Sequence, residues 1–321
     1  MSIIQTLKEK VLQGEKIDKA EAMQLVDADF GELCKAADEI RQKFCGNGFD
    51  MCTITSGKNG KCSENCKYCA QAGCYHTGAD VYPLLSTEEI LKEARRDAEA
   101  GVPRYSIVTS GKRLSKKEVD QVCESIRAIK EELDIDVCAS FGLLDEEDFK
   151  KLKEVGVTRV HNNLETSRTY FPKVCSTHTY DDKIQAIKAA QKVGMSVCCG
   201  GLMGIGETME DRIDMALTIR ELGVDSVPVN VLNPISGTPL ENQKVLSNDE
   251  VTRIVAIFRF ILPDASIRMA GGRSLLGDMG RQCFQSGANA TISGSMLTTA
   301  GITIEKDMAL LEELGYKLEL V

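Results

Sequence analysis

The sequence has no stretch that approaches the roughly 20 consecutive apolar residues that a helix needs to cross a bilayer. Its first residues, M-S-I-I-Q-T-L-K-E-K, also lack the charged start, the apolar middle and the small-residue cleavage site of a secretory signal. These absences argue against a membrane-spanning or secreted protein. We expect a cytoplasmic one, in which thiols stay reduced.

The sequence also lacks an excess of basic residues. Lys and Arg number 39 against 48 Asp and Glu, which gives a net charge of −9. Nucleic acids and anionic membranes bind basic surfaces, so we expect neither as a partner. Histidine is scarce as well, and none of His76, His161 and His178 lies in the sequence pattern of a catalytic partner.

Cysteine, by contrast, is abundant, with 13 in 321 residues. A reducing compartment disfavours a disulfide framework, and an odd number of cysteines cannot pair completely. The cysteines therefore indicate metal or redox chemistry.

From about residue 50 onward, short β-rich runs alternate with amphipathic helical stretches. The runs predict strands at 51–55, 104–109, 136–141, 158–163, 195–200, 226–231, 265–270 and 290–294. Eight strands alternating with helices predict an α/β protein with a parallel (β/α)8 barrel of the TIM type. We expect residues 1–45 to form an N-terminal helical extension and residues 46–321 to form the barrel with a C-terminal helix. Function in such barrels lies at the C-terminal ends of the strands and in the loops that follow.

Three cysteines lie in the loop after the first predicted strand. Cys62, Cys66 and Cys69 in C-S-E-N-C-K-Y-C supply three thiolates within eight residues. Thiolates are the usual ligands of iron–sulfur clusters, and three of them leave one iron of a [4Fe–4S] cluster open to another ligand. The alternative is a zinc site, but structural zinc needs four ligands, and the fourth would have to be His76 or Cys74.

The spacing C-x3-C-x2-C after strand 1 of a barrel resembles the radical S-adenosylmethionine (SAM) superfamily. The resemblance implies that Cys62, Cys66 and Cys69 are catalytic and hold a [4Fe–4S] cluster whose open iron binds SAM. One electron then cleaves SAM to a 5′-deoxyadenosyl radical. Tyr68 matches the family position beside the adenine, and G-I-G-E-T at 204–208 resembles the glycine-rich stretch after strand 5.

Longer motifs resemble the biotin synthase family in order and spacing over nearly the whole chain. They are T-S-G-K-N-G-K-C-S-E-N-C-K-Y-C-A-Q, V-H-N-N-L-E-T-S, T-H-T-Y-D-D-K-I, C-C-G-G-L-M-G-I-G-E-T, S-V-P-V-N-V-L-N-P-I-S-G-T-P-L and S-I-R-M-A-G-G-R. The resemblance implies a radical SAM sulfurtransferase that inserts sulfur into dethiobiotin to give biotin. It implies two SAM molecules per product, an auxiliary iron–sulfur cluster as sulfur donor, an electron donor such as flavodoxin or ferredoxin, and a homodimer.

The same resemblance assigns four polar residues to ligands. Asn163 and Asn230 match amides that hydrogen-bond the ureido ring of dethiobiotin, and paired amides suit a neutral urea. Glu165 matches an acidic position at the ribose hydroxyls of SAM. Lys183 stands where relatives usually have an Arg for the SAM carboxylate, so the charge is kept but the two-pronged geometry is not. The alternative is that the asparagines are strand-end turn residues and Lys183 is a solvated helix lysine.

The sequence departs from the family at the auxiliary cluster. Relatives use cysteines from strands 2, 3 and 5 and an arginine from strand 7. Cys138, Cys198 and Arg268 match three of these positions, but Ser106 stands at the strand 2 position. Side chains alternate along a strand, which predicts that Cys138 and Arg268 point into the barrel. Arg268 would then be a buried charge that needs an anion or a cluster beside it.

Cys52 on strand 1 could replace the thiol that is missing at Ser106. Our hypothesis is that Cys52, Cys138 and Cys198 hold the auxiliary cluster, with Arg268 beside or on it. The cluster is either [2Fe–2S] or of a four-iron type.

Three further residues border these predicted sites. Cys199 is an extra thiol beside Cys198 and a candidate further ligand of the auxiliary cluster, although by alternation it faces outward unless a bulge turns it in. Cys175, in the loop after strand 4, is an alternative ligand, and His161 at the end of strand 4 borders the predicted SAM pocket. The plainer alternative is that Cys52 and Cys199 are small buried hydrophobes.

Two other classes compete with this interpretation. One is another radical SAM enzyme of the same branch, such as those that mature hydrogenases or rearrange lysine. Cys138, Cys198, Arg268 and the N-V-L-N-P-I-S-G-T-P-L motif favour sulfur insertion over it. The other is a non-catalytic iron–sulfur protein, which would not cleave SAM.

Overall fold

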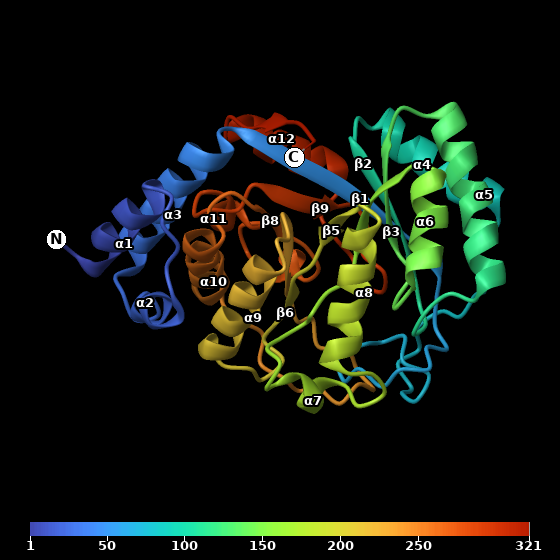
Figure 1. The fold of residues 1–321 in the computed structure, drawn as a ribbon, viewed down its shortest axis with the longest axis horizontal. Coiled ribbons are helices and arrows are strands. Elements are labelled where there is room, and N and C mark those ends of the chain that lie inside the picture. The colour runs from blue at the N-terminus through green and yellow to red at the C-terminus, as the bar shows by residue number, and fades with distance from the viewer. Residues whose placement is uncertain (321) are drawn as a thin grey trace.

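Eight parallel strands close into a barrel in the computed structural model, which describes residues 1–320 (Figure 1). The strands follow one another around the barrel, and the last one pairs back with the first. They are β1 (Gly48–Lys58), β2 (Arg104–Thr109), β3 (Asp136–Ser140), β4 (Val157–His161), β5 (Ser196–Cys198), β7 (Ser226–Val231), β8 (Ser266–Met269) and β9 (Ala290–Ser293). The predicted TIM-type (β/α)8 fold is confirmed.

One predicted strand is wrong in its extent. The run 195–200 does not form a single strand, because β5 ends at Cys198 and a separate short strand, β6 (Gly201–Met203), follows. Opposite the break lies Pro228 of β7, which has no N–H to donate to a ladder. A Cβ on Gly200 would lie 2.0 Å from the Pro228 carbonyl oxygen, so the two backbones approach closely there. Pairing with β7 resumes at Gly201.

Helices pack around the outside of the barrel, as Figure 1 shows for α4, α5, α6, α8 and α9. Several begin with reciprocal capping boxes, such as Ser86 with Glu89 at α4 and Ser115 with Glu118 at α5. The helices after β1 are α4 (Thr87–Glu99), α5 (Lys116–Glu132), α6 (Glu146–Glu154), α7 (Phe171–Val174), α8 (Tyr180–Lys192), α9 (Met209–Glu221), α10 (Asn248–Ile261), α11 (Arg281–Phe284) and α12 (Ile304–Glu313).

The N-terminal residues form three helices beside α9 and α10 (Figure 1). They are α1 (Ile3–Leu12), α2 (Lys19–Gln24) and α3 (Phe30–Cys45). At the other end of the chain, β10 (Lys317–Leu318) pairs with the first residues of β1. Among residues 1–320, no helix is both long enough and apolar enough to span a membrane.

The outward-facing side chains of the strands form the apolar core against the helices. Ile107, Val137, Val160 and Ile267 are each at most 3% exposed there. The barrel interior is different, because it contains charged and thiol side chains around a cavity of about 390 Å³. The cavity reaches the loops that follow the strands, which is where sites lie in this fold.

Candidate active site

Backbone hydrogen bonds fold the loop between β1 and α4 into a tight coil. Cys62 donates its N–H to the carbonyl of Gln71 at 3.0 Å, and Cys69 donates to the carbonyl of Cys66 at 3.0 Å. Cys62 and Cys69 line one end of the cavity, and all three cysteines are partly exposed free thiols. The loop thus presents three thiols in one short turn of chain.

The structure gives no support to a zinc site closed by Cys74 or His76, because both of these residues are exposed. In the described part of the chain, a different group brings its ligand atoms within 4.8 Å of one another, namely Cys66, Cys175 and His178.

Tyr68 and Glu165 lie together in the cavity wall next to this loop. Burial and the neighbouring Glu165 carboxylate raise the pKa of Tyr68. Glu165 has a left-handed backbone, with φ of 70°, which costs a non-glycine residue energy. Strands β5 and β6 hold it there, since Glu165 donates to the carbonyl of Gly200 (3.1 Å) and accepts from the N–H of Leu202 (2.9 Å). Such conformations are concentrated at functional sites.

The two asparagines expected at the substrate both line the cavity. Asn163 Oδ1 accepts from the N–H of Gly200 at 3.0 Å, at the break between β5 and β6. Asn230 Oδ1 accepts from Gly271 N–H at 3.0 Å, and its Nδ2 donates to Gly201 O at 3.1 Å. These bonds fix each amide at a strand end, yet each oxygen keeps a second lone pair.

Lys183 and His161 also line the cavity. Lys183 Nζ donates to Asn162 Oδ1 at 3.2 Å, so this lysine lies at the cavity wall and is not a freely solvated helix residue. His161 pairs in register with Cys198 across β4 and β5. The structure therefore places His161 at the inner thiols.

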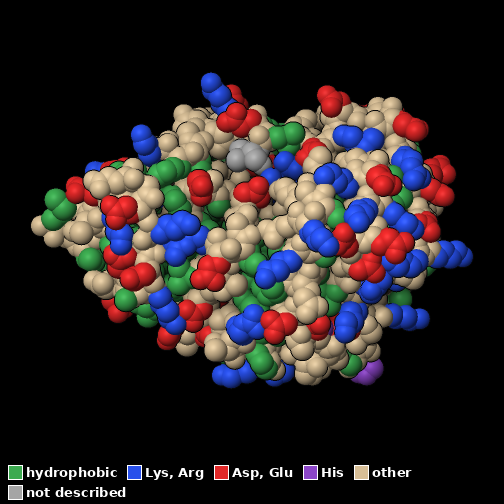
Figure 2. All heavy atoms as spheres, in the orientation of Figure 1, with side chains coloured by type: hydrophobic (Ala, Val, Ile, Leu, Met, Phe, Trp, Pro, Cys, Tyr) green, Lys and Arg blue, Asp and Glu red, His purple; other side chains and the backbone are tan. Residues whose placement is uncertain are grey.

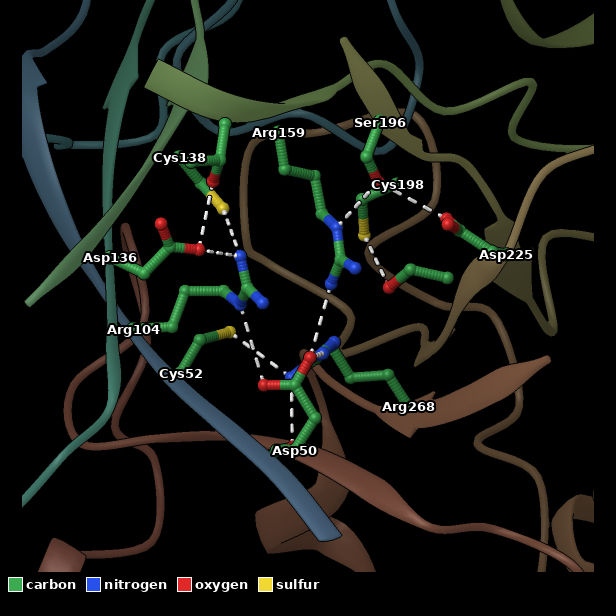
Figure 3. A network of polar contacts seen from close by, with 12 residues as sticks. Asp50, Cys52, Arg104, Asp136, Cys138, Arg159, Ser196, Cys198, Asp225 and Arg268 are labelled. Atoms are coloured by element: carbon green, nitrogen blue, oxygen red, sulfur yellow. Dashed lines mark hydrogen bonds and ion pairs between the residues drawn. The ribbon is translucent and has the colours of Figure 1, made fainter. Parts of the chain in front are cut away.

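Three buried thiols line the inner part of the same cavity. Cys52, Cys138 and Cys198 are each at most 8% exposed, and they come from β1, β3 and β5. Figure 3 shows their sulfur atoms directed toward one interior space that also holds three arginines. Arg268 Nη1 donates to Cys52 Sγ at 3.3 Å, and Arg104 Nη1 donates to Cys138 Sγ at 3.7 Å.

The arginines converge on one fully buried carboxylate, Asp50 (Figure 3). Arg268 Nη2 lies 2.7 Å from Asp50 Oδ2, Arg159 Nη1 lies 3.1 Å from it, and Arg104 Nε lies 3.4 Å from Asp50 Oδ1. Arg104 also pairs with Asp136. Three arginines and two aspartates leave one positive charge in excess among these five residues. A buried excess of this kind favours an anion among the thiols.

The thiols do not ionise equally. Burial raises the pKa of Cys52 to about 11 and that of Cys138 to about 12. Burial also acts on Cys198, but the hydrogen bond with His161 and the positive charges of Arg268 and Arg159 outweigh it and lower its pKa to about 7. The thiolate is the ligand form of cysteine, so Cys198 is the first of the three to reach it.

Sequence reasoning missed the charged residues around Arg268. Asp50, Arg104 and Arg159 were not among the expected site residues. The signal was present, because alternation puts Asp50 on the same face of strand 1 as Cys52 and puts Arg159 on the same face of strand 4 as His161. A charged residue on the inward face of a barrel strand is as informative as a cysteine there.

Cys199 lies away from the other thiols. It is 0% exposed and belongs to the apolar core between barrel and helices. The break after β5 does not turn it inward, and the outward orientation expected from alternation is what the structure has.

Comparison with known proteins identifies the family of this chain. Residues 59–219 match the family described as the Radical SAM superfamily, and residues 228–317 match the Biotin and Thiamin Synthesis associated domain. The chain is 60% identical to a biotin synthase of Brachyspira hyodysenteriae, over 98% of this chain and 94% of that protein. It is 56% identical to biotin synthase 2 of Corynebacterium diphtheriae, over 100% of this chain and 97% of that protein.

The chain belongs to the biotin synthase family. The solved structure of methylornithine synthase has the same fold, with a TM-score of 0.85 at 23% identity over 98% of this chain and 97% of that one. Membership in the family makes the chain a radical SAM enzyme and implies a [4Fe–4S] cluster and SAM as cofactors.

Proposed function

We propose that this chain converts dethiobiotin to biotin by radical-mediated sulfur insertion. The observation that carries the proposal is a single cavity with two groups of thiols. Cys62 and Cys69 line it at the loop end, and Cys52, Cys138 and Cys198 line its inner part. An enzyme that abstracts hydrogen at one place and delivers sulfur at another needs its substrate between two such groups.

The loop residues fit the donor set of a cluster with one open iron. Cys62, Cys66 and Cys69 would hold a [4Fe–4S] cluster, and when SAM is bound to it this group supplies the radical that abstracts hydrogen from unactivated carbon. Tyr68 and Glu165 would hold the adenosyl part of SAM, the first by its ring and the second by accepting from ribose hydroxyls. Lys183 would face the carboxylate of SAM.

The strand-end amides fit a neutral cyclic urea. Asn163 and Asn230 each keep a free lone pair on Oδ1 after their backbone contacts, and the cavity wall between them is mostly apolar. Rigid amides held by backbone bonds would orient the ureido ring of dethiobiotin with little loss of side-chain entropy.

The inner thiols fit a sulfur-rich anion. Cys52, Cys138 and Cys198 would hold the auxiliary cluster, which supplies the sulfur atom that is inserted. Arg268 would donate to it, and the excess positive charge of the arginine group would offset the cost of burying its negative charge. In this assignment Cys52 takes the place of the thiol that Ser106 lacks.

The reaction also needs an electron for each SAM molecule. A small flavin or iron–sulfur protein, such as flavodoxin or ferredoxin, would deliver it in the cytoplasm. The loop around Cys62 lies near the molecular surface and is the natural side for such a donor to approach.

The test is biotin formation by the purified protein. Reconstituted anaerobically and supplied with SAM, dethiobiotin and a reductant, the protein should give biotin and about two molecules of 5′-deoxyadenosine per biotin, both measured by mass spectrometry. Cys69→Ala should abolish both products. Cys74→Ala, which removes an exposed cysteine from the same loop, should change neither. If 5′-deoxyadenosine forms without biotin, the chain is a radical SAM enzyme with another substrate.

A further inference from the structure

A second cluster of metal-ligating side chains lies next to the loop cysteines, and the proposed reaction does not use it. Cys175 and His178 come from the segment between α7 and α8, and Glu64 comes from the cysteine loop itself. All three are buried, at 4%, 8% and 7% exposed. A buried cysteine, histidine and glutamate in contact with one another need a physical account.

The ligand atoms of Cys66, Cys175 and His178 all lie within 4.8 Å of one another. Cys175 Sγ is 3.3 Å from His178 Nδ1, and that nitrogen is 2.7 Å from Glu64 Oε2. In a tetrahedral zinc site with Zn–S of about 2.3 Å and Zn–N of about 2.0 Å, neighbouring ligand atoms lie about 3.5 Å apart. The 3.3 Å between Cys175 Sγ and His178 Nδ1 is close to this spacing, and the third ligand atom, on Cys66, lies near enough to join the same ion after a small movement.

We propose that Cys66, Cys175 and His178 bind a single divalent transition-metal ion, Zn²⁺ above all, in molecules that have not acquired the loop cluster. Two thiolates and one imidazole nitrogen supply three of the four ligands of a zinc site, and a water molecule would complete it. The Glu64 carboxylate, 2.7 Å from His178 Nδ1, orients the imidazole. This donor set holds Zn²⁺ more tightly than Fe²⁺.

The site is held in shape by contacts between its two segments. Asn65 Nδ2 donates to Ser176 Oγ at 2.7 Å, and Asn65 Oδ1 accepts from the N–H of Ser176 at 3.0 Å. Thr177 Oγ1 donates to Glu64 Oε2 at 2.8 Å. The ring of Phe171 packs against the imidazole of His178, with centroids 5.5 Å apart. Ligands fixed in this way need little rearrangement to bind an ion.

Cys66 is a ligand in both the ion site and the proposed loop cluster. Competition between zinc and the cluster follows, and this part of the inference rests on the proposed function. Cys66 cannot be bound to a Zn²⁺ ion at Cys175 and to the loop cluster at the same time. Zinc at this site would therefore block assembly of the cluster. Zn²⁺ binds thiolates and neutral imidazole, so binding displaces the protons that these groups still carry, and zinc affinity rises with pH.

Zinc binding to the metal-free anaerobic protein tests the proposal. Zn²⁺ is added alone, its affinity is measured by competition with a chromophoric chelator, and Co²⁺ is used as a spectroscopic probe of thiolate ligands. Cys175→Ser and His178→Ala should each lose about tenfold or more in affinity. A Cys62→Ala, Cys69→Ala double variant should retain it, because neither residue is a ligand of this site.

The opposite pattern would overturn the proposal. If the double variant loses zinc while Cys175→Ser keeps it, the ion binds the loop triad and not the Cys175 group. Cys74→Ala is the matched control, since it removes an exposed cysteine from the same loop and should bind zinc as the unsubstituted protein does.

Competition with cluster assembly separates this proposal from the proposed function. Zinc added before reconstitution should lower the iron content of the unsubstituted protein but not that of Cys175→Ser. Neither readout uses dethiobiotin. Failure to form biotin would thus leave the zinc result standing, and failure to bind zinc would leave the proposed reaction untouched.

Discussion

At the scale of single residues, the decisive feature is a group of buried charges that orders three thiols. Asp50 forms ion pairs with Arg104, Arg159 and Arg268. Arg104 and Arg268 also donate hydrogen bonds to thiols. A buried arginine next to a thiol stabilises the thiolate over the neutral form. The pairing with Asp50 offsets the cost of burying the arginines. The arginines also lower the pKa values of Cys52 and Cys138, although burial still holds both above the usual value.

We predict that Cys52→Ala lowers the iron and sulfide content by the share of the auxiliary cluster. Hydrogen abstraction depends on the loop site, so 5′-deoxyadenosine should still form while biotin formation falls at least tenfold. Iron and sulfide assays on anaerobic protein, together with product analysis, measure this. Cys199→Ala is the control, because Cys199 packs in the apolar core. Full iron content and activity in Cys52→Ala would mean that Cys52 is only a buried hydrophobe.

Asp50→Asn should destabilise the fold by about 3–5 kcal/mol near pH 7, since it leaves buried arginines without their shared carboxylate. Burial raises the pKa of Asp50, but Arg268, Arg104 and Arg159 outweigh it and hold the pKa below its usual value of 3.8. A lowered pKa contributes stability above the unfolded value, and that stability is lost as pH falls through the folded value.

The difference in unfolding free energy between the two proteins should accordingly be constant from pH 7 to about 5 and narrow only below about pH 4. Urea unfolding at a series of pH values measures it. Asp134→Asn, at an exposed aspartate, should stay within about 0.5 kcal/mol of the unsubstituted protein. A difference that widens in acid would show that Asp50 is protonated in the fold.

Sequence patterns predicted the orientation of Cys138 and Arg268 because alternation along a strand is a local property. They did not predict what Arg268 meets. Asp50 lies 218 positions away in the chain, on a strand that is separated from β8 by β9 alone. Only the closure of β1 against β9, next to β8, brings the two together. A pairing of that range depends on strand register, which no single segment encodes.

At the scale of elements, the break between β5 and β6 shapes the site. Because of the break, the Gly200 N–H is free to donate a hydrogen bond to Asn163 Oδ1. Glu165, in its left-handed conformation, forms a bridge with Gly201 at the start of β6. The run M-S-V-C-C-G at 195–200 predicted one continuous strand because its residues are apolar or small throughout. The break comes from Pro228 on the neighbouring β7, so its cause lies outside the segment.

Gly201→Ala should weaken SAM binding because Gly201, next to the break, packs against Glu165, the residue proposed to bind the ribose of SAM. A Cβ on Gly201 would lie 2.4 Å from the carbonyl oxygen of Glu165, so that carbonyl and its side chain must move. We expect the dissociation constant for SAM, measured by equilibrium dialysis, to rise about tenfold and the unfolding free energy to fall by about 1–3 kcal/mol. Gly277→Ala, at an exposed glycine with no atom within 4 Å of the added Cβ, should change neither quantity. Unchanged SAM binding in Gly201→Ala would remove Glu165 from the SAM site.

At the scale of the whole molecule, charge is distributed in two different ways. On the face shown in Figure 2, Lys and Arg side chains lie interspersed with Asp and Glu over the outer helices. Inside the barrel, three arginines and two aspartates lie together beside the thiols. The barrel wall therefore separates a well-screened exterior from an interior where each charge interacts strongly with its neighbours.

The N-terminal extension packs on the outer helices of the barrel, with α3 against α10 and α2 against α9. Leu25, Leu33 and Ile40 are 0% exposed, and α10, the helix that α3 packs on, is buried along nearly its whole length. We propose that residues 1–45 are part of one folding unit with the barrel and not a separable domain. Removing them would expose a contiguous apolar face of α10, and patches of that kind cause association.

Deletion of residues 1–45 should therefore give a chain that is largely insoluble or that melts well below the full-length protein. Soluble yield and thermal unfolding followed by circular dichroism measure this. The ion pairs across the same boundary contribute little, since Lys19 contacts Glu210 and Asp214 at an exposed position. Lys19→Ala should thus lower the unfolding free energy by less than about 1 kcal/mol. If the shortened chain were soluble and melted as the full-length protein does, apolar packing of the extension would not stabilise the barrel.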